Sequence, residues 1–386
     1  MRKFNRCEGA AGFAAICRGL SAASLLALTF SAPGEAVGAK DQFKGVSAEV
    51  EDDVAGIAGA ISHHTGNHPP PLDGSRWEWK GEVTGDDVWG RKVESGAPYL
   101  TSSGIGHIVN GQGRYNGQSY ASIPLLLGTN DLNSWDSYPR PVLEYADWQL
   151  EGWANTIASG GNKWGRVSPH ALVYDDENSQ FVLYFQSRQE LHNGPPGIRS
   201  VGLATSKDMI NWTHQDEVWY TVDDWIDDFS ELLDESDHSS LYSASYPRVV
   251  GAWKHDGYYY IIMNGNKSTG QGISSTRRIM RSKHATRGFK PYPIDRSGMV
   301  PYAPPVEYGG TWYLPWRIGS KVGIYTSERL EGPYEDFVEL FELHPPYPGR
   351  ERASGFNLFR WNGKWCITYY LRPPGERGVH MWGMEK

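Results

Sequence analysis

The alternation of apolar and polar positions is clearest between Val167 and Trp212, where three short runs of β-branched and aromatic residues follow one another. They read V-S-P-H-A-L-V-Y, F-V-L-Y-F-Q-S-R and S-V-G-L-A-T-S, and D-D-E-N-S separates the first two. Runs of this kind, bounded by turn-forming residues, are typical of β-strands. A Ser-Pro start is compatible with a strand, because proline has no N–H for the ladder and is tolerated at a first residue. The segment therefore predicts three consecutive short strands.

Similar units recur along the chain, opening at Gly96, Ser168, Ser245, Tyr302 and Ser354. Each begins with small residues or proline and a strand, turns at Asp or Gly, and continues into an aromatic strand. Three units then reach a third strand with a Thr-Ser or Thr-Asn pair before a Trp or Tyr. Five units of several short strands predict an all-β fold, a five-bladed β-propeller. A β-sandwich is the alternative, which the fixed order of the units disfavours.

The last unit is short, since only Val379–Met384 remains after Trp365–Tyr370 to form a further strand. We therefore expect the segment Trp77–Val83 to supply its missing outer strand. Such a pairing would join the two ends of the ring and remove exposed strand edges.

The N-terminus combines basic residues with an apolar run, Leu20–Phe30, that is too short to span a bilayer, followed by small residues. This plan predicts a secretory signal peptide over residues 1–39, and hence a secreted or periplasmic protein. A retained membrane anchor is the alternative. Residues 40–75 are expected to form a flexible leader, and residues 76–386 the propeller domain.

Composition restricts the partners. A net charge of −8 over 386 residues argues against nucleic acid and against an anionic membrane surface. Once the signal peptide is removed, Cys366 is the one cysteine left, so no intramolecular disulfide is possible and we expect a buried, unreactive thiol. We also expect a monomer. The leader histidines His63, His64 and His68 can be interpreted as a metal tract or as part of a solvated linker, and the linker interpretation is favoured. No phosphate loop, Ser-His-Asp motif or zinc spacing is evident, and Thr205-Ser206 and Thr326-Ser327 are expected to be structural.

Four motifs carry a family resemblance: S-P-H-A-L-V-Y, V-G-L-A-T-S-K-D-M, V-G-I-Y-T-S and G-K-W-C-I-T-Y-Y. Together they resemble the five-bladed propeller glycosidases, nearest to glycoside hydrolase family 43 and related to the fructosidase and neoagarooligosaccharide hydrolase families. The resemblance runs from about Gly96 to Tyr370. It implies hydrolysis of glycosidic bonds in plant or algal oligosaccharides, with inversion and without a required cofactor. An ion on the propeller axis, present in some relatives, is left open.

The sequence departs from that family at its catalytic positions. The family places an Asp base before the first blade's proline, a second Asp before a later one, and a Glu acid in a Glu-Gly-Pro-like entry. Here Ala97, Tyr246 and Ala303 precede the entry prolines. Glu331-Gly332-Pro333 follows a third-strand pattern and is expected to be an outer turn. A carbohydrate-binding propeller without catalysis is therefore the alternative function.

Glycoside hydrolysis needs a proton donor and a second group that activates water or attacks the sugar. Polar residues near the strand entries are the candidates, because the inner strands of a propeller converge on its axis. His170 could donate the proton, since histidine titrates near neutrality. Glu351, between two arginines, suits a base. The candidate catalytic residues are Glu94, His170, Asp237 and Glu351, and the polar substrate-binding candidates are Arg248 and Asn357.

Tryptophans in the entries and loops favour a carbohydrate partner, because an indole offers a flat apolar face to a sugar ring and an N–H to its hydroxyls. Trp153, Trp164 and Trp316 are the candidates for this contact. The insertions Leu143–Trp164 and Tyr220–Ser240 are expected to rim one end of the propeller, which favours a pocket for chain ends or short oligosaccharides.

Overall fold

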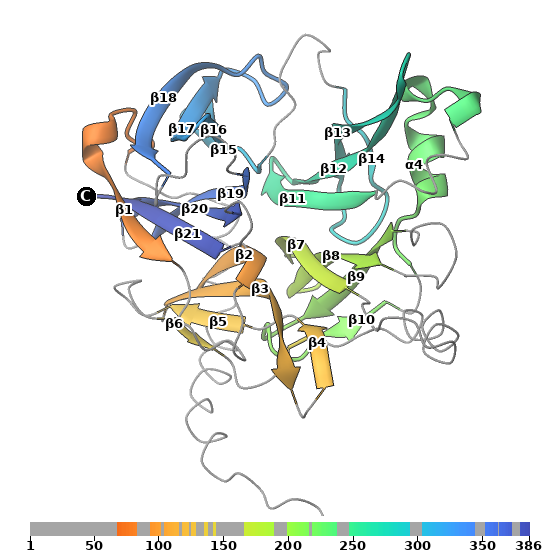
Figure 1. Ribbon diagram of the computed structural model, residues 1–386, viewed down its shortest axis with the longest axis horizontal. Helices are drawn as coiled ribbons and strands as arrows, with labels where there is room; N and C mark the ends of the chain where they lie inside the picture. The colour runs from red at the N-terminus through yellow and green to blue at the C-terminus, as the bar shows by residue number, and fades with distance from the viewer. Residues whose placement is uncertain are drawn as a thin grey trace, which may run out of the picture. The chain divides into compact units, whose positions relative to one another are not determined.

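The described strands of the computed structural model form five antiparallel sheets set around a common centre, a β-propeller (Figure 1). The structure describes residues 68–82, 93–101, 104–115, 118–122, 125–128, 135–137, 142–143, 166–188, 199–215, 218–237, 247–293, 303–343, 352–361, 363–372 and 379–386. Within these ranges, side chains are not described for 82–137, 166–170, 187–188, 199, 352, 354, 372 and 379–380. All described residues belong to the compact unit Phe43–Lys386.

Each sheet corresponds to one of the five units expected from the sequence, and its innermost strand comes from the unit's opening. Blade 1 contains β2 (Val93–Thr101), β3 (Gly104–Tyr115), β5 (Leu125–Gly128) and β6 (Trp135–Ser137), with β4 (Gln118–Ser122) paired to β3. Blade 2 contains β7 (Arg166–Asp175), β8 (Gln180–Arg188), β9 (Arg199–Ser206) and β10 (Thr213–His214). Blade 3 contains β11 (Arg248–His255), β12 (Tyr258–Thr269), β13 (Gly272–Ser282) and β14 (Lys290–Pro291). Blade 4 contains β15 (Val306–Tyr308), β16 (Thr311–Ile318), β17 (Lys321–Ser327) and β18 (Glu335–Glu342). Blade 5 contains β19 (Arg352–Trp361), β20 (Lys364–Arg372), β21 (Val379–Glu385) and β1 (Trp77–Glu82).

The described hydrophobic core lies between blades, as the two faces of blade 3 show. Alternate residues of β12 show this division. Ile261 and Met263 belong to a cluster shared with blade 2, whereas Tyr260 and Ile262 belong to a cluster shared with blades 4 and 5. Inner strands of adjacent blades also touch, with β7 in contact with both β2 and β11. The continuous apolar runs in the sequence are thus strands covered on two sides.

The recurring Thr-Ser motif leads into the outer turn of a blade, in agreement with the structural role expected from the sequence. In blade 2, Asp208 Oδ1 accepts hydrogen bonds from the hydroxyl of Ser206 at 2.9 Å and from the backbone N–H of Asn211 at 2.7 Å. Trp212 Nε1 closes the turn on the carbonyl of Met209 at 2.8 Å. In blade 4, Ser327 Oγ accepts from the N–H of Arg329 at 3.1 Å. These hydroxyls are therefore structural.

The predicted closure of the ring is confirmed. β1 pairs antiparallel with β21, in a register that joins Trp77 to Glu385 and Glu82 to Met381. Blade 5 thus takes its outermost strand from the N-terminal side of the propeller and its other three from the C-terminal end. The edge of β21, which would otherwise present unpaired backbone groups, is covered.

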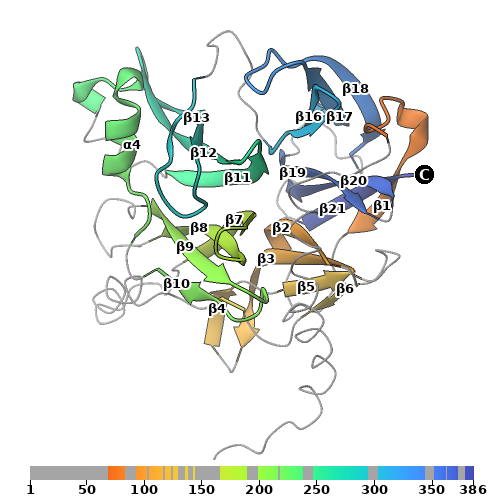
Figure 2. The same ribbon diagram turned by 180° about the vertical axis from the view of Figure 1, so that it is seen from behind.

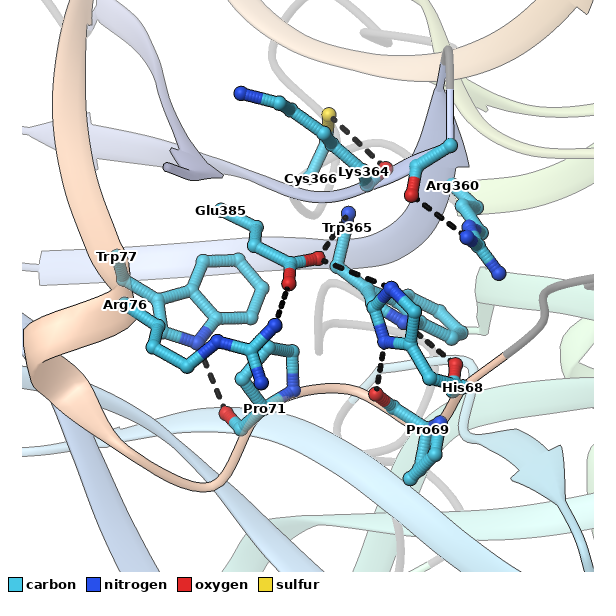
Figure 3. A network of polar contacts seen from close by, with 11 residues as sticks. His68, Pro69, Pro71, Arg76, Trp77, Arg360, Lys364, Trp365, Cys366 and Glu385 are labelled. Carbon is cyan, nitrogen blue, oxygen red and sulfur yellow. Dashed lines mark hydrogen bonds and ion pairs between the residues drawn. The ribbon is translucent and has the colours of Figure 1, made fainter.

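Residues 68–75, expected to belong to a flexible leader, instead pack against blade 5 (Figure 3). The indole N–H of Trp365 donates to the carbonyl of His68 at 3.1 Å, and that of Trp77 donates to the carbonyl of Pro71 at 2.9 Å. Asp73 caps the short helix η1 (Gly74–Arg76) by accepting from the N–H of Ser75. The correction has a physical reason, since two buried indoles need acceptors and the carbonyls of this segment supply them.

Glu385 is the centre of this contact. Its carboxylate, with a side chain 5% exposed, accepts from the guanidinium of Arg76 and from the backbone N–H of Trp365 at 3.2 Å, and it lies 3.8 Å from the ring of His68 (Figure 3). Cys366 lies beside it, fully buried as expected, and burial raises the pKa of its thiol. We call Glu385, Arg76, His68 and Trp365 the closure network.

The insertion after Tyr220 contains a short helix, α4 (Val222–Asp228), followed by the turns η2 (Ser230–Leu232) and η3 (Glu235–Asp237). Thr221 and Asp224 form a capping box at the helix start. Figure 2 shows α4 alongside β12 and β13. Trp225 fixes it there, because its Nε1 donates to the carbonyl of Asn266 at 2.9 Å. Among the described residues, no helix has the length and apolar character needed to cross a membrane.

Candidate functional site

The topology brings the first residues of the inner strands to equivalent places in their blades. In blades 1, 2, 3 and 5 the start of the innermost strand pairs towards the end of the second strand, as Arg248 does with Asn264 and Ser168 with Gln186. We call this the entry end of a blade. Because inner strands of a propeller surround its axis, the entry ends are where side chains of different blades can face one substrate.

Four inner strands share an irregularity at the entry end, a single-residue β-bulge. In β2 the register shifts between Val93 and Gly96, and in β7 between Pro169 and Ala171. It shifts again between Val249 and Gly251 in β11, and between Ser354 and Asn357 in β19. A bulge bends its strand and redirects a side chain, and bulges are frequent next to active sites. The repetition of this feature near the start of four inner strands marks the entry ends as the candidate functional site.

Two predicted catalytic residues lie at these bulges. Glu94 falls within the shift in β2, and His170 is the extra residue of the bulge in β7. Their backbone positions are described and their side chains are not. The structure thus places both at the entry ends of adjacent blades, since β2 and β7 are in contact. Their catalytic roles stay predictions.

Arg248 begins β11 and is half-buried, as a substrate-binding residue at an entry end would be. Its partner across the ladder is Asn264, and the next partner along the same row is Arg277 of β13. Asn264 is only 2% exposed, and within the described part of the chain its Oδ1 has no hydrogen-bond partner. An unsatisfied buried polar group costs roughly 1–3 kcal/mol, so this site carries a cost that the fold does not require.

Asn357 lies at the bulge of β19, where its amide has local partners. Nδ2 donates to the carbonyl of Gly355 at 3.1 Å and to Thr368 Oγ1 at 3.4 Å. Gly355 has a φ of +61°, a conformation that favours glycine. These contacts hold the bulge in shape, so Asn357 positions the entry end of blade 5 whatever else it contacts.

Trp316 lies at the junction of blades 4 and 5. Its ring is half-buried, with its centroid 5.4 Å from that of Phe356. The neighbouring Arg317 donates through Nε to the carbonyl of Ala353, at 3.2 Å, near the start of β19. Trp316 thus lies in the second strand of blade 4, and part of its indole is used for packing between blades, while its role in substrate binding stays a prediction.

The other predicted residues lie away from the innermost strands or outside the described residues. Asp237 ends η3 and is half-buried, in the insertion that packs on the β12–β13 hairpin rather than on an inner strand. This insertion lies at the entry end of blade 3, because Asp234 N–H donates to Ser268 Oγ near the tip of that hairpin at 2.7 Å. Glu351, Trp153 and Trp164 lie outside the described residues.

A perturbed carboxyl was not anticipated from the sequence. Burial raises the pKa of Asp228 in α4, although the Tyr220 hydroxyl donates to it at 3.1 Å and opposes that shift. A raised pKa suits a general acid. However, Tyr220 pairs with Val201 of β9 on the edge that faces away from β8, so Tyr220 lies beyond the third strand of blade 2. We do not include it in the site.

Sequence reasoning also missed Asn264 and Arg277. The signal for Asn264 was present, because a polar residue ends the apolar run from Tyr258 to Met263, where the burial continues. The sequence around Arg277 contains no such signal. Only the strand register, which pairs Arg277 with Asn264, places it at the entry end. Within the described ranges, no group of three or more His, Cys, Asp or Glu is placed to hold a metal ion.

Comparisons with known proteins show that the chain shares its fold with solved structures, at low sequence identity. No family model and no curated protein matches the chain. A complex of BT0996 with RGII has a TM-score of 0.52 at 11% identity, over 87% of this chain and 95% of that one. CoXyl43, a family 43 β-xylosidase/α-arabinofuranosidase from a compost microbial metagenome in complex with xylotriose, has a TM-score of 0.49 at 13% identity, over 80% and 95%. The α-L-arabinofuranosidase PaAbf62A from Podospora anserina, in complex with cellotriose, has 0.46 at 10%, over 82% and 99%. At these identities the likeness is one of fold.

Proposed function

We propose that this protein is a secreted glycoside hydrolase that inverts configuration at the anomeric carbon. Its substrates are oligosaccharides derived from plant or algal polysaccharides, and its active site is formed by the entry ends of the inner strands. The observation that carries the proposal is the repeated bulge, which places Glu94 and His170 at irregular positions of two adjacent inner strands. A carboxyl and a titratable imidazole can divide the roles of base and acid between them.

The fold and the motifs support the same class. In a propeller the outer strands and turns stabilise the fold, so residues of the inner strands can form a catalytic site. The blade motifs resemble those of the propeller glycosidases over most of the chain from Gly96 to Tyr370. The xylotriose and cellotriose of the solved structures belong to those proteins, and we propose an oligosaccharide of unspecified linkage for this one.

A carbohydrate-binding propeller without catalysis is the second candidate. The observation in its favour is the sequence at the three entries, where Ala97, Tyr246 and Ala303 precede the prolines. Under this alternative the bulges and the half-buried Arg248 would shape a binding surface only.

The decisive experiment is a screen for reducing-sugar release from arabinan, xylan, galactan, agar and carrageenan oligosaccharides. On any substrate that is cleaved, His170→Ala and Glu94→Gln should each lower kcat/KM by about 100-fold or more, the usual contribution of a general acid or base. His284→Ala and Glu328→Gln, both in outer turns, are the matched controls and should leave turnover unchanged. NMR of the first product anomer tests inversion, and N-terminal sequencing of exported protein tests cleavage near residue 39.

The outcomes separate the two candidates. Release that survives both site variants would refute the assignment of the site. Calorimetric binding of an oligosaccharide without release from any substrate would establish the binding alternative. If no substrate is cleaved and no oligosaccharide binds, both candidate functions are refuted.

A further inference from the structure

Blade 3 presents a row of three polar residues at its entry end. Arg248 of β11, Asn264 of β12 and Arg277 of β13 are directly paired across the ladder. Side chains of directly paired residues lie on the same face of a sheet, with Cβ atoms of neighbours about 4.5–5.5 Å apart. We call these three residues the basic row.

The face on which the row lies follows from the alternation along the strands. Asn264 has the parity of Tyr260 and Ile262, and Arg277 has that of Ile279, all of which pack in the cluster shared with blade 4. Met263 and Met280, with the opposite parity, pack towards blade 2. The basic row therefore faces blade 4 and continues, as a polar extension, the apolar rows that form the core.

The cost of this arrangement suggests a ligand. Two cations flank an amide that is 2% exposed and whose Oδ1 has no hydrogen-bond partner in the described part of the chain. Apolar side chains at these places would extend the core without that cost, and departures of this kind concentrate at functional sites. Both arginines have interactions within the fold. A guanidinium has five N–H donors, so such interactions leave donors for a further partner.

The chemistry of the row defines that partner. Guanidinium groups bind carboxylates and sulfates through paired N–H donors, more strongly than they bind neutral hydroxyls. The free Asn264 oxygen needs a donor, which a sugar hydroxyl next to the anionic group provides. An acidic sugar combines the two functions, either as a uronate or as a sulfate ester.

We propose that the oligosaccharide bound at the entry ends carries an anionic group, and that Arg248, Asn264 and Arg277 recognise it. This inference rests on the proposed function, because it names the substrate class of the same site. It also accounts for a local pair of arginines in a chain whose net charge is −8.

The test compares three sets of oligosaccharides by isothermal titration calorimetry on the full-length exported protein: uronate-containing, sulfated and neutral, matched in length. One acidic set should bind at least about tenfold more tightly than the neutral set, and the preference should weaken as salt rises. The set that binds identifies the anionic group.

Variants locate the preference. Asn264→Asp keeps the shape of the side chain and places a carboxylate between the arginines, so it should fold and abolish the preference for acidic sugars. Arg277→Gln should reduce the preference by about tenfold. Arg278→Gln is the matched control, since Arg278 is next in the strand, faces the opposite side and donates to the carbonyl of Arg277 at 2.8 Å.

The results distinguish this inference from the function on which it rests. Equal or tighter binding of neutral oligosaccharides would overturn the inference and leave the proposed function intact. An acidic preference that persists in Asn264→Asp and Arg277→Gln would also overturn it. Absence of binding to every set would overturn the proposed function itself.

Discussion

Removing the carboxylate of Glu385 should loosen the ring where its two ends meet. In Glu385→Ala, the backbone N–H of Trp365 loses its acceptor at 3.2 Å, in a residue with no exposed surface. An unsatisfied buried N–H costs roughly 1–3 kcal/mol. The pair with Arg76 adds less, because the Arg76 side chain is 54% exposed and its charge is screened by water.

We therefore expect the free energy of unfolding to fall by about 2–3 kcal/mol. For a folded unit of this size each kcal/mol lowers Tm by roughly 2–4 °C, which gives a decrease of about 4–12 °C. Differential scanning calorimetry measures it directly. Glu385→Gln retains an acceptor for the Trp365 N–H, so its Tm should fall clearly less than that of Glu385→Ala.

Glu339→Ala is the matched control, because Glu339 pairs with Lys321 between outer strands of blade 4 and is 39% exposed. Its effect on Tm should be a small fraction of that of Glu385→Ala. Equal decreases in the two variants would refute the reasoning, since they would show that the closure network contributes no more than a surface ion pair.

Three further predictions concern single side chains. A Cβ at Gly265 would lie 2.2 Å from the ring of Trp225, so Gly265→Ala should destabilise the fold by about 1–3 kcal/mol and expose α4 to limited proteolysis, whereas Gly270→Ala, with open space around it, should not. Burial raises the pKa of Asp228 in the folded protein. Ionisation of this carboxyl therefore opposes folding once the pH rises above the ordinary pKa of an aspartate. Asp228→Asn should therefore raise Tm at pH 7 and leave it unchanged at pH 3, and an equal change at both would contradict this cause. Since burial raises the pKa of the Cys366 thiol, Ellman's reagent should modify it only after unfolding, and fast modification of the native protein would disprove its burial.

The blade architecture could be predicted from the sequence because its signals are local and repeated. Each unit carries its own strand entry, turn and aromatic strand, and five copies support one another. The closure by Trp77–Glu82 could be predicted as well, because the last unit lacked an outer strand.

The bulges could not be predicted, although they define the site. A bulge adds one residue to one strand without changing composition, and the surrounding residues at His170 and at Val250 read as ordinary strand. The packing of residues 68–75 was missed for a different reason. Its partners lie far away in the sequence, as His68 and Trp365 do, which are 297 positions apart.

The departures from the family's catalytic positions concern chemistry rather than folding. The described motifs that hold the blades together, such as the turn built on Asp208 and the closure network, lie on turns and on strands other than the innermost ones. The sequence with Ala97, Tyr246 and Ala303 at these positions is therefore compatible with a closed propeller. For the same reason, an intact fold is no evidence for catalysis. Only the response of turnover to His170 and Glu94, and of sugar preference to Asn264, bears on what the entry ends do.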